Sequence, residues 1–130
     1  ELATYARVEN ASYRTLKALT PGPFTFLLRA TREVPRRLVH ARRKTIGLRI
    51  PDHSIVRGIL EQLGEPMMST TMRLPGEDDP LTEPEIIRDR LEHAVDVVID
   101  GGACGLVPTT IVDLTADVGV VIRQGLGEFA

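Results

Sequence analysis

The feature that most constrains this chain is the order of its apolar segments. Segments with the spacing of amphipathic helices alternate with short β-branched or aromatic segments over the first two-thirds, and strand-like segments follow one another at the end. Proline and glycine bound most of these segments. Such an order is typical of α/β proteins with a layered sheet of parallel and antiparallel strands.

The helical segments are recognised by apolar residues that recur at three- or four-residue steps. Tyr13, Leu16 and Leu19 have this spacing before a Pro-Gly-Pro stop, and Gly64 has the place of a helix C-cap. We expect helices within residues 12–20, 52–64 and 82–93, and a helical turn within 33–43. The predicted strands are residues 24–30, 45–51, 66–71, 94–102, 109–115 and 119–125, and the third of these, "PMMSTT", is expected to be buried.

Length and composition fit one domain. The chain has 130 residues with 42% hydrophobic content, and it has no apolar run long enough to span a membrane. Its single cysteine, Cys104, excludes an internal disulfide, and a cytoplasmic location is the natural expectation. The chain opens in a predicted helix without a methionine, so we expect residues 1–130 to be the C-terminal portion of a single domain.

The net charge of −2 hides two segments of opposite sign. Residues 29–49 hold eight basic residues and one acid, whereas residues 77–100 hold nine acids and two arginines. The basic segment suits phosphate or nucleic acid, whereas any single arginine in it is more simply explained by a solvated helix face plus a loop. The acidic segment is interpreted as a solvated surface.

Polar side chains stand at the ends of several predicted strands, which is where α/β proteins bind ligands. Arginine there suits a carboxylate or phosphate, and Ser69 and Thr71 lie on the same side of an extended segment. Each residue also has a structural explanation, since threonine is common in strands and arginine at helix ends. The strand-end candidates are Thr25, Arg49, Ser69, Thr71, Thr109, Thr110, Asp113 and Arg123. No metal-ligand spacing and no P-loop accompany them.

Six motifs together resemble the YrdC/YciO family, and most closely its YciO branch. They are "TPGPFTFLL", "KTIGLRIPDH", "MMSTTMRLPGE", "VDVVIDGG", "PTTIVDLT" and "VIRQGLGE". The resemblance implies a YrdC/RibB-like fold, in which helices flank a twisted, mixed, mostly parallel open sheet around a basic cavity, here incomplete at its N-terminus. It also implies a threonylcarbamoyl-AMP synthase-like activity, which condenses L-threonine, bicarbonate and ATP and releases pyrophosphate for the modification of adenosine 37 in tRNA.

The resemblance also implies roles for individual residues. Arg49 matches the arginine that holds the threonine carboxylate, and Thr25 matches a contact near the amino acid. Ser69, Thr71, Thr109, Thr110 and Arg123 match positions that contact the nucleotide or its phosphates. Mg²⁺ is expected to be held mainly by phosphate oxygens, with few protein ligands, and no residue is named as a metal ligand.

Two departures from the synthase pattern lead to a second hypothesis. Thr71 stands where the synthase branch has asparagine, and the family's Lys-x-Arg phosphate motif is not within these residues. The alternative is a non-catalytic module of the same fold that binds nucleotide or double-stranded RNA. Its RNA-binding candidates are Arg36, Arg37, Arg42, Arg43 and Lys44. A third possibility is a relative that keeps the fold with an eroded site.

Overall fold

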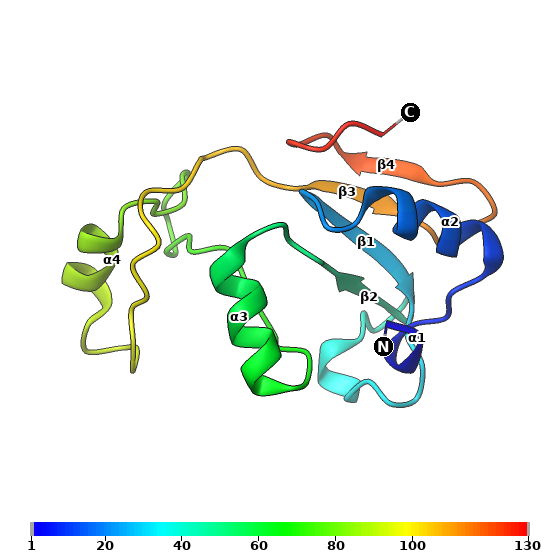
Figure 1. The fold of residues 1–130 in the computed structure, drawn as a ribbon, viewed down its shortest axis with the longest axis horizontal. Helices are drawn as coiled ribbons and strands as arrows, with labels where there is room; N and C mark the ends of the chain where they lie inside the picture. Colours follow the sequence, from blue (N-terminus) through cyan, green and yellow to red (C-terminus); the bar gives the residue numbers. More distant parts are fainter. Residues whose placement is uncertain (1, 130) are drawn as a thin grey trace. The chain divides into compact units, whose positions relative to one another are not determined.

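The fold was analysed in a computed structural model, which describes residues 2–129. In chain order the elements are α1 Leu2–Tyr5, α2 Asn10–Leu19, β1 Phe24–Arg29, the 3₁₀ turn η1 Arg36–Leu38, β2 Thr45–Leu48, α3 Ser54–Leu63, α4 Pro84–Leu91, β3 Thr110–Asp113 and β4 Val120–Arg123 (Figure 1). They group into two compact units. The first contains the residues up to His53 and those from Pro108 onward, and the second is Ser54–Val107. No helix in residues 2–129 has the length and apolarity needed to cross a membrane.

The first unit is built on a four-stranded sheet with the strand order β2-β1-β3-β4 (Figure 1). β1 pairs with β3 in parallel, whereas β1–β2 and β3–β4 are antiparallel. The predicted α/β class with a mixed open sheet is therefore confirmed. The expectation of mostly parallel strands is wrong for residues 2–129, because β3 and β4 are joined by a short turn, which produces an antiparallel neighbour.

Alternation along β1 separates the two faces of this sheet. Phe24, Phe26 and Leu28 are buried on one face, and the rings of Phe24 and Phe26 stack with their centroids 5.6 Å apart. Val112 of β3 is fully buried beside them. Helix α2 covers this face with Leu16, and Ser12 donates a hydrogen bond from its hydroxyl to the carbonyl of Leu114. The hydrophobic core of the described residues lies between α2 and the sheet.

The opposite face of the sheet, which we call the outer face, carries the remaining strand residues. Register places Thr25 beside Ile111, and Leu27 between Gly47 and Asp113. Arg29 ends β1 on the same face, opposite Thr45 of β2. Polar and charged side chains are thus concentrated on the face that α2 does not cover.

The second unit contains α3, α4 and long irregular segments. Both helices were predicted, and Gly64 ends α3 at φ +72°, with its N–H bonded to the carbonyl of Leu60. The strands predicted at residues 66–71 and 94–102 are wrong, since both segments are irregular and mostly exposed. Met68 is 77% exposed and Val97 72%. Neither segment pairs with a strand within residues 2–129, and β-propensity alone does not stabilise an unpaired backbone.

The assignment of residues 1–130 to one domain stays a prediction. Residues 77–100 include no buried residue, so the acidic segment lies at the surface. Within it, Arg90 Nη1 and Glu77 Oε1 form an ion pair at 2.7 Å.

Candidate functional site

Five of the residues predicted for ligand binding gather at one edge of the sheet in the first unit. The strand directions bring the amino ends of β1 and β3 to the same edge as the carboxyl ends of β2 and β4. Thr25 is the second residue of β1, and Arg49 directly follows β2. Thr109 and Thr110 stand at the start of β3, and Arg123 is the last residue of β4.

Register aligns several of these residues in a row across the outer face. Thr25 is paired with Ile111, and Ile111 is paired with Arg123. Continuing the β1–β2 register by one residue beyond the Phe26–Leu48 pair places Arg49 opposite Thr25. The row therefore has an arginine position at each end, with hydroxyl and apolar groups between. Such an arrangement suits a ligand with two anionic groups.

The centre of this edge is a hydrogen-bonded group that we call the Thr25–Thr109–Arg123 cluster. The hydroxyl oxygens of Thr25 and Thr109 lie 2.7 Å apart. Arg123 donates to the carbonyl oxygen of Thr109 from Nε at 3.1 Å and from Nη2 at 2.8 Å. Its Nη2 also donates to the Thr109 hydroxyl at 3.1 Å. Three strands are thus joined by side chains, and the guanidinium is held in a fixed orientation.

Thr110 supports the cluster from the core side. It is fully buried, and its hydroxyl donates to the carbonyl of Gly127 at 2.6 Å and accepts from the N–H of Gly125 at 2.9 Å. These bonds tie the segment after β4 to the start of β3. Gly125 is required for this approach, since a Cβ there would lie 2.3 Å from the carbonyl oxygen of Pro108. In this structure the Thr110 hydroxyl bonds only backbone groups of the described residues. A contact between Thr110 and phosphate stays a prediction.

Arg49 is exposed beside this edge. The chain around it is fixed by a hydrogen bond from the N–H of Gly22 to the carbonyl of Ile50 at 2.9 Å. This bond ties the Pro-Gly-Pro turn before β1 to the end of β2, so the motif "TPGPFT" supports the position of both Arg49 and Thr25. The resemblance-based role of Arg49 toward threonine stays a prediction.

Ser69 and Thr71 belong to the second unit. Both are exposed residues of an irregular segment, and the carbonyl of Thr71 accepts a hydrogen bond from the N–H of Arg73 at 2.8 Å. The segment then turns, with the N–H of Leu81 bonded to the carbonyl of Met72 at 2.7 Å. Their hydroxyls are available to a ligand, and a role toward phosphates stays a prediction.

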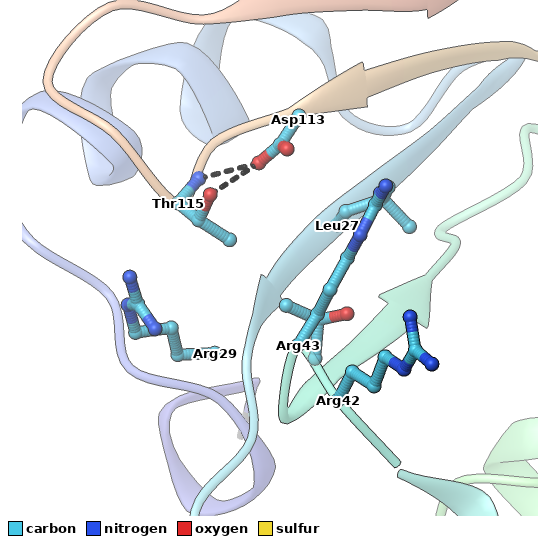
Figure 2. Close-up of a pocket in the computed structure, with 7 residues that line it drawn as sticks. Leu27, Arg29, Arg42, Arg43, Asp113 and Thr115 are labelled. Atoms are coloured by element: carbon cyan, nitrogen blue, oxygen red, sulfur yellow. Dashed lines mark hydrogen bonds between the residues drawn. The ribbon is translucent and has the colours of Figure 1, made fainter. Parts of the chain in front are cut away.

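The other end of the outer face holds a hollow of about 250 Å³, which we call the arginine hollow. It is lined by Leu27, Arg29, Arg42, Arg43, Thr45, Asp113 and Thr115 (Figure 2). Among the RNA-binding candidates, Arg42 and Arg43 belong to it, and Arg37 lines a neighbouring hollow with Arg43. Arg36 and Lys44 line neither hollow.

Sequence reasoning missed the residues that complete the arginine hollow. Thr115 was not among the candidate site residues, and Arg29 was included only as part of the basic segment 29–49, although strand alternation places it on the outer face. The role of His40 was also missed. Its Nδ1 accepts hydrogen bonds from the N–H groups of Arg42 and Arg43 at 3.2 and 3.1 Å. The available signal was the position of His40, two residues before Arg42 and three before Arg43, because a side-chain acceptor at that spacing can bond the backbone of a turn.

The residues described by the structure offer no protein metal site. Within residues 2–129, no group of three histidine, cysteine, aspartate or glutamate side chains is arranged to hold an ion. Cys104 is an exposed free thiol.

Comparison with known proteins places this geometry in a family. The Sua5/YciO/YrdC family model, described as "Telomere recombination", matches residues 1–125. The chain is 52% identical over 128 residues to the uncharacterized protein YciO of Escherichia coli K12, covering 98% of this chain and 62% of that protein. The crystal structure of E. coli YciO superposes with a TM-score of 0.92 at the same identity and coverage.

More distant relatives carry a functional name. A putative threonylcarbamoyl-AMP synthase of Methanocaldococcus jannaschii is 32% identical over 127 residues, which is 97% of this chain and 58% of that protein. The crystal structure of Sua5 from P. abyssi in complex with L-threonine has a TM-score of 0.83 at 26% identity, covering 95% of this chain and 36% of that one. The chain thus spans less than two-thirds of each of these relatives.

Proposed function

The chain belongs to the Sua5/YciO/YrdC family, and on this basis we propose that its full-length protein condenses L-threonine, bicarbonate and ATP to threonylcarbamoyl-AMP and pyrophosphate. Support comes from relatives named for this reaction and from a Sua5 structure that holds L-threonine. The observation that carries the proposal is the convergence of Arg49, the Thr25–Thr109 pair and Arg123 on one sheet edge.

In this proposal the amino acid lies across the middle of the row. The carboxylate of threonine is held by Arg49, because a guanidinium matches a carboxylate with two parallel hydrogen bonds. The hydroxyl of Thr25 lies at the register position next to Arg49 and is already oriented by Thr109 at 2.7 Å. It is therefore placed to orient the amino group or side chain of the bound threonine.

The reaction forms one bond to carbon and one bond to phosphorus. The threonine amine combines with bicarbonate to give a carbamate, with loss of water. A carbamate oxygen then attacks the α-phosphorus of ATP, and the bond from that phosphorus to the bridging oxygen breaks to release pyrophosphate. This transfer needs alignment and charge neutralisation more than a side-chain nucleophile. The absence of a catalytic motif in the sequence is consistent with such chemistry.

We assign the nucleotide phosphates to the Arg123 end of the row. Nε and Nη2 of Arg123 donate three hydrogen bonds to Thr109, which fix the plane of the guanidinium. Its Nη1 then has no partner within residues 2–129 and can donate to a phosphate oxygen. Ser69 and Thr71 belong to the second unit, and their hydroxyls are proposed to bind phosphate oxygens, as the family resemblance implies.

Mg²⁺ would neutralise phosphate charge when ATP is bound. We propose that such an ion is held mainly by phosphate oxygens. What the chain itself supplies are guanidinium and hydroxyl groups that orient the two substrates.

The experiment is to incubate the full-length protein with ATP, L-threonine and bicarbonate and to measure pyrophosphate and threonylcarbamoyl-AMP. Formation of both products, with loss of both when threonine or bicarbonate is omitted, is expected. An Arg49→Gln variant should raise the KM for threonine with little change in the KM for ATP. No product from a folded wild-type protein that binds ATP and threonine would overturn the proposal.

A further inference from the structure

The pairing of β3 with β4 contains one extra residue. Val112 pairs with Val121, and Ile111 pairs with Arg123, so Ile122 lies between two pairs as an insertion in β4. Such an insertion is a β-bulge, which interrupts the ladder of hydrogen bonds and changes the direction of the side chains that follow it. Because paired residues share a face of the sheet, the bulge places Arg123 on the outer face with Ile111.

A straight pairing of the same strands would remove Arg123 from the outer face. If β4 paired without a bulge, Ile122 would stand opposite Ile111. Arg123 would then stand opposite Thr110, which is fully buried on the core side of the sheet. Its guanidinium would point away from Thr109 and the outer face. The bulge at Ile122 therefore decides whether Arg123 is available to a ligand at this edge.

The sequence of β4 does not choose between these two registers. Val120, Val121 and Ile122 are all apolar, and β4 is an edge strand (Figure 1). Val120 is 53% exposed and Ile122 52%, so burial in the core favours neither register. Register is weakly specified in a strand whose two faces are alike. Since the bulge also interrupts the ladder, contacts outside β4 are needed to stabilise it.

These contacts come from residues 124–127, which we call the return turn. The buried hydroxyl of Thr110 accepts from the N–H of Gly125 at 2.9 Å and donates to the carbonyl of Gly127 at 2.6 Å. Gln124 donates from Nε2 to the same carbonyl at 2.8 Å. The return turn is thus bonded to the first residue of β3, and its bonds begin directly after the last residue of β4.

The backbone of the return turn adds a further bond to the same place. The N–H of Leu126 donates to the carbonyl of Pro108 at 3.0 Å. Moving the chain after Val121 by one position would displace all of these groups from their partners. The hydroxyl of Thr110 would then be buried without its two backbone partners, which is costly inside a packed core. The return turn therefore favours the bulged register over the straight one.

We propose that Thr110 and Gln124 are positioning residues, which hold the bulged register of β4 through the return turn and thereby keep Arg123 on the outer face. Neither residue contacts a ligand in this role. Only the consequence for nucleotide affinity rests on the proposed function, because that function assigns the phosphates to Arg123. The register itself is independent of any reaction.

The test measures the register by NMR in the full-length protein. A cross-strand backbone contact between Ile111 and Arg123 marks the bulged register, and a contact between Ile111 and Ile122 marks the straight one. Thr110→Val keeps the shape of the side chain and removes the hydroxyl, so the first contact should be lost and the second should appear. Thr110→Ser keeps the hydroxyl and should retain the bulged register.

Two further variants complete the comparison of registers. Gln124→Met removes one donor to the return turn from an exposed position, so it does not endanger folding and should weaken the Ile111–Arg123 contact in part. Thr45→Val is the matched control, because Thr45 is a buried strand threonine whose hydroxyl has no hydrogen bond within residues 2–129. It should leave the contacts of Arg123 as they are in the wild-type protein.

Calorimetry with ATP and with L-threonine supplies the functional readout. In Thr110→Val the Kd for ATP should rise about three- to tenfold and the Kd for threonine should change less, with wild-type values restored in Thr110→Ser. An unchanged Ile111–Arg123 contact in Thr110→Val would overturn the proposal, and the same result in Gln124→Met would overturn it if the valine variant does not fold. A changed register with an unchanged Kd for ATP would support the positioning role and refute the assignment of the phosphates to Arg123, which separates the two failures.

Discussion

The hydroxyl oxygens of Thr25 and Thr109 lie 2.7 Å apart, although 84 positions separate the two residues in the sequence. Their contact depends on the parallel pairing of β1 with β3, which brings the two strand starts together. Arg123 joins the same contact from β4 through the hydroxyl of Thr109. The pairing of β1 with β3 therefore positions two hydroxyl groups and a guanidinium at the edge where we place the substrates.

Thr25→Val tests this contact, since valine keeps the shape of threonine and removes the hydroxyl. We expect a loss of about 1 kcal/mol in the free energy of unfolding, because one partly buried hydrogen bond disappears. The KM for threonine should also rise, because the hydroxyl that we propose to orient the bound amino acid is lost. Thr25→Ser, which keeps the hydroxyl, is the control, measured by urea denaturation and steady-state kinetics. Wild-type values for Thr25→Val in both assays would contradict the assignment.

Arg123→Lys tests whether the planar guanidinium is needed beyond its charge. Lysine has a single ammonium group, which cannot bond the carbonyl and hydroxyl of Thr109 in the fixed geometry of Nε and Nη2. We expect the KM for ATP to rise about three- to tenfold. The KM for threonine should change less, because Arg49 serves the amino acid. A similar rise for both substrates would show that the row does not divide them as proposed.

The sheet was predictable where strand segments alternate and find partners nearby. Residues 24–30, 45–51, 109–115 and 119–125 contain β1, β2, β3 and β4. Residues 66–71 and 94–102 have similar composition, yet they are irregular in the structure, because a strand also requires a neighbour with which to pair. Composition therefore located candidates for strands, and pairing decided among them.

The candidate site was predictable in its residue types and only partly in its geometry. Strand ends identified Thr25, Arg49, Thr109 and Arg123, but their alignment depends on the strand order β2-β1-β3-β4, which is a non-local property. The arginine hollow was even harder to predict from the sequence. Arg29 and Asp113 belong to strands separated by most of the chain, and only the parallel register of β1 and β3 brings these strands together.

Gly127→Ala tests the packing beneath the threonine edge. Gly127 is buried, and a Cβ there would lie 2.5 Å from the ring of Phe24. We expect a loss of about 1–3 kcal/mol in the free energy of unfolding, since the ring must shift within a packed core. Thermal denaturation followed by circular dichroism measures this change.

Gly58→Ala is the matched control for Gly127→Ala. Gly58 lies within α3, and a Cβ there would meet nothing within 4 Å. The same substitution should therefore increase stability by about 0.5–1 kcal/mol, because alanine is the better helix former. Opposite signs for two identical substitutions are expected. Destabilisation by both would indicate that other atoms pack against α3 at Gly58.

His40→Ala tests whether His40 positions the arginines of the hollow. Without Nδ1, the N–H groups of Arg42 and Arg43 lose their acceptor, and the loop from residue 40 to 45 gains conformational freedom. We expect faster hydrogen exchange at these two amides, since they lose their acceptor. Global stability should change little, since His40 is exposed. His40→Asn supplies a side-chain oxygen that can accept from the same N–H groups, so it should restore the exchange protection. Equally fast exchange in the asparagine and alanine variants would show that these two hydrogen bonds do not hold the loop.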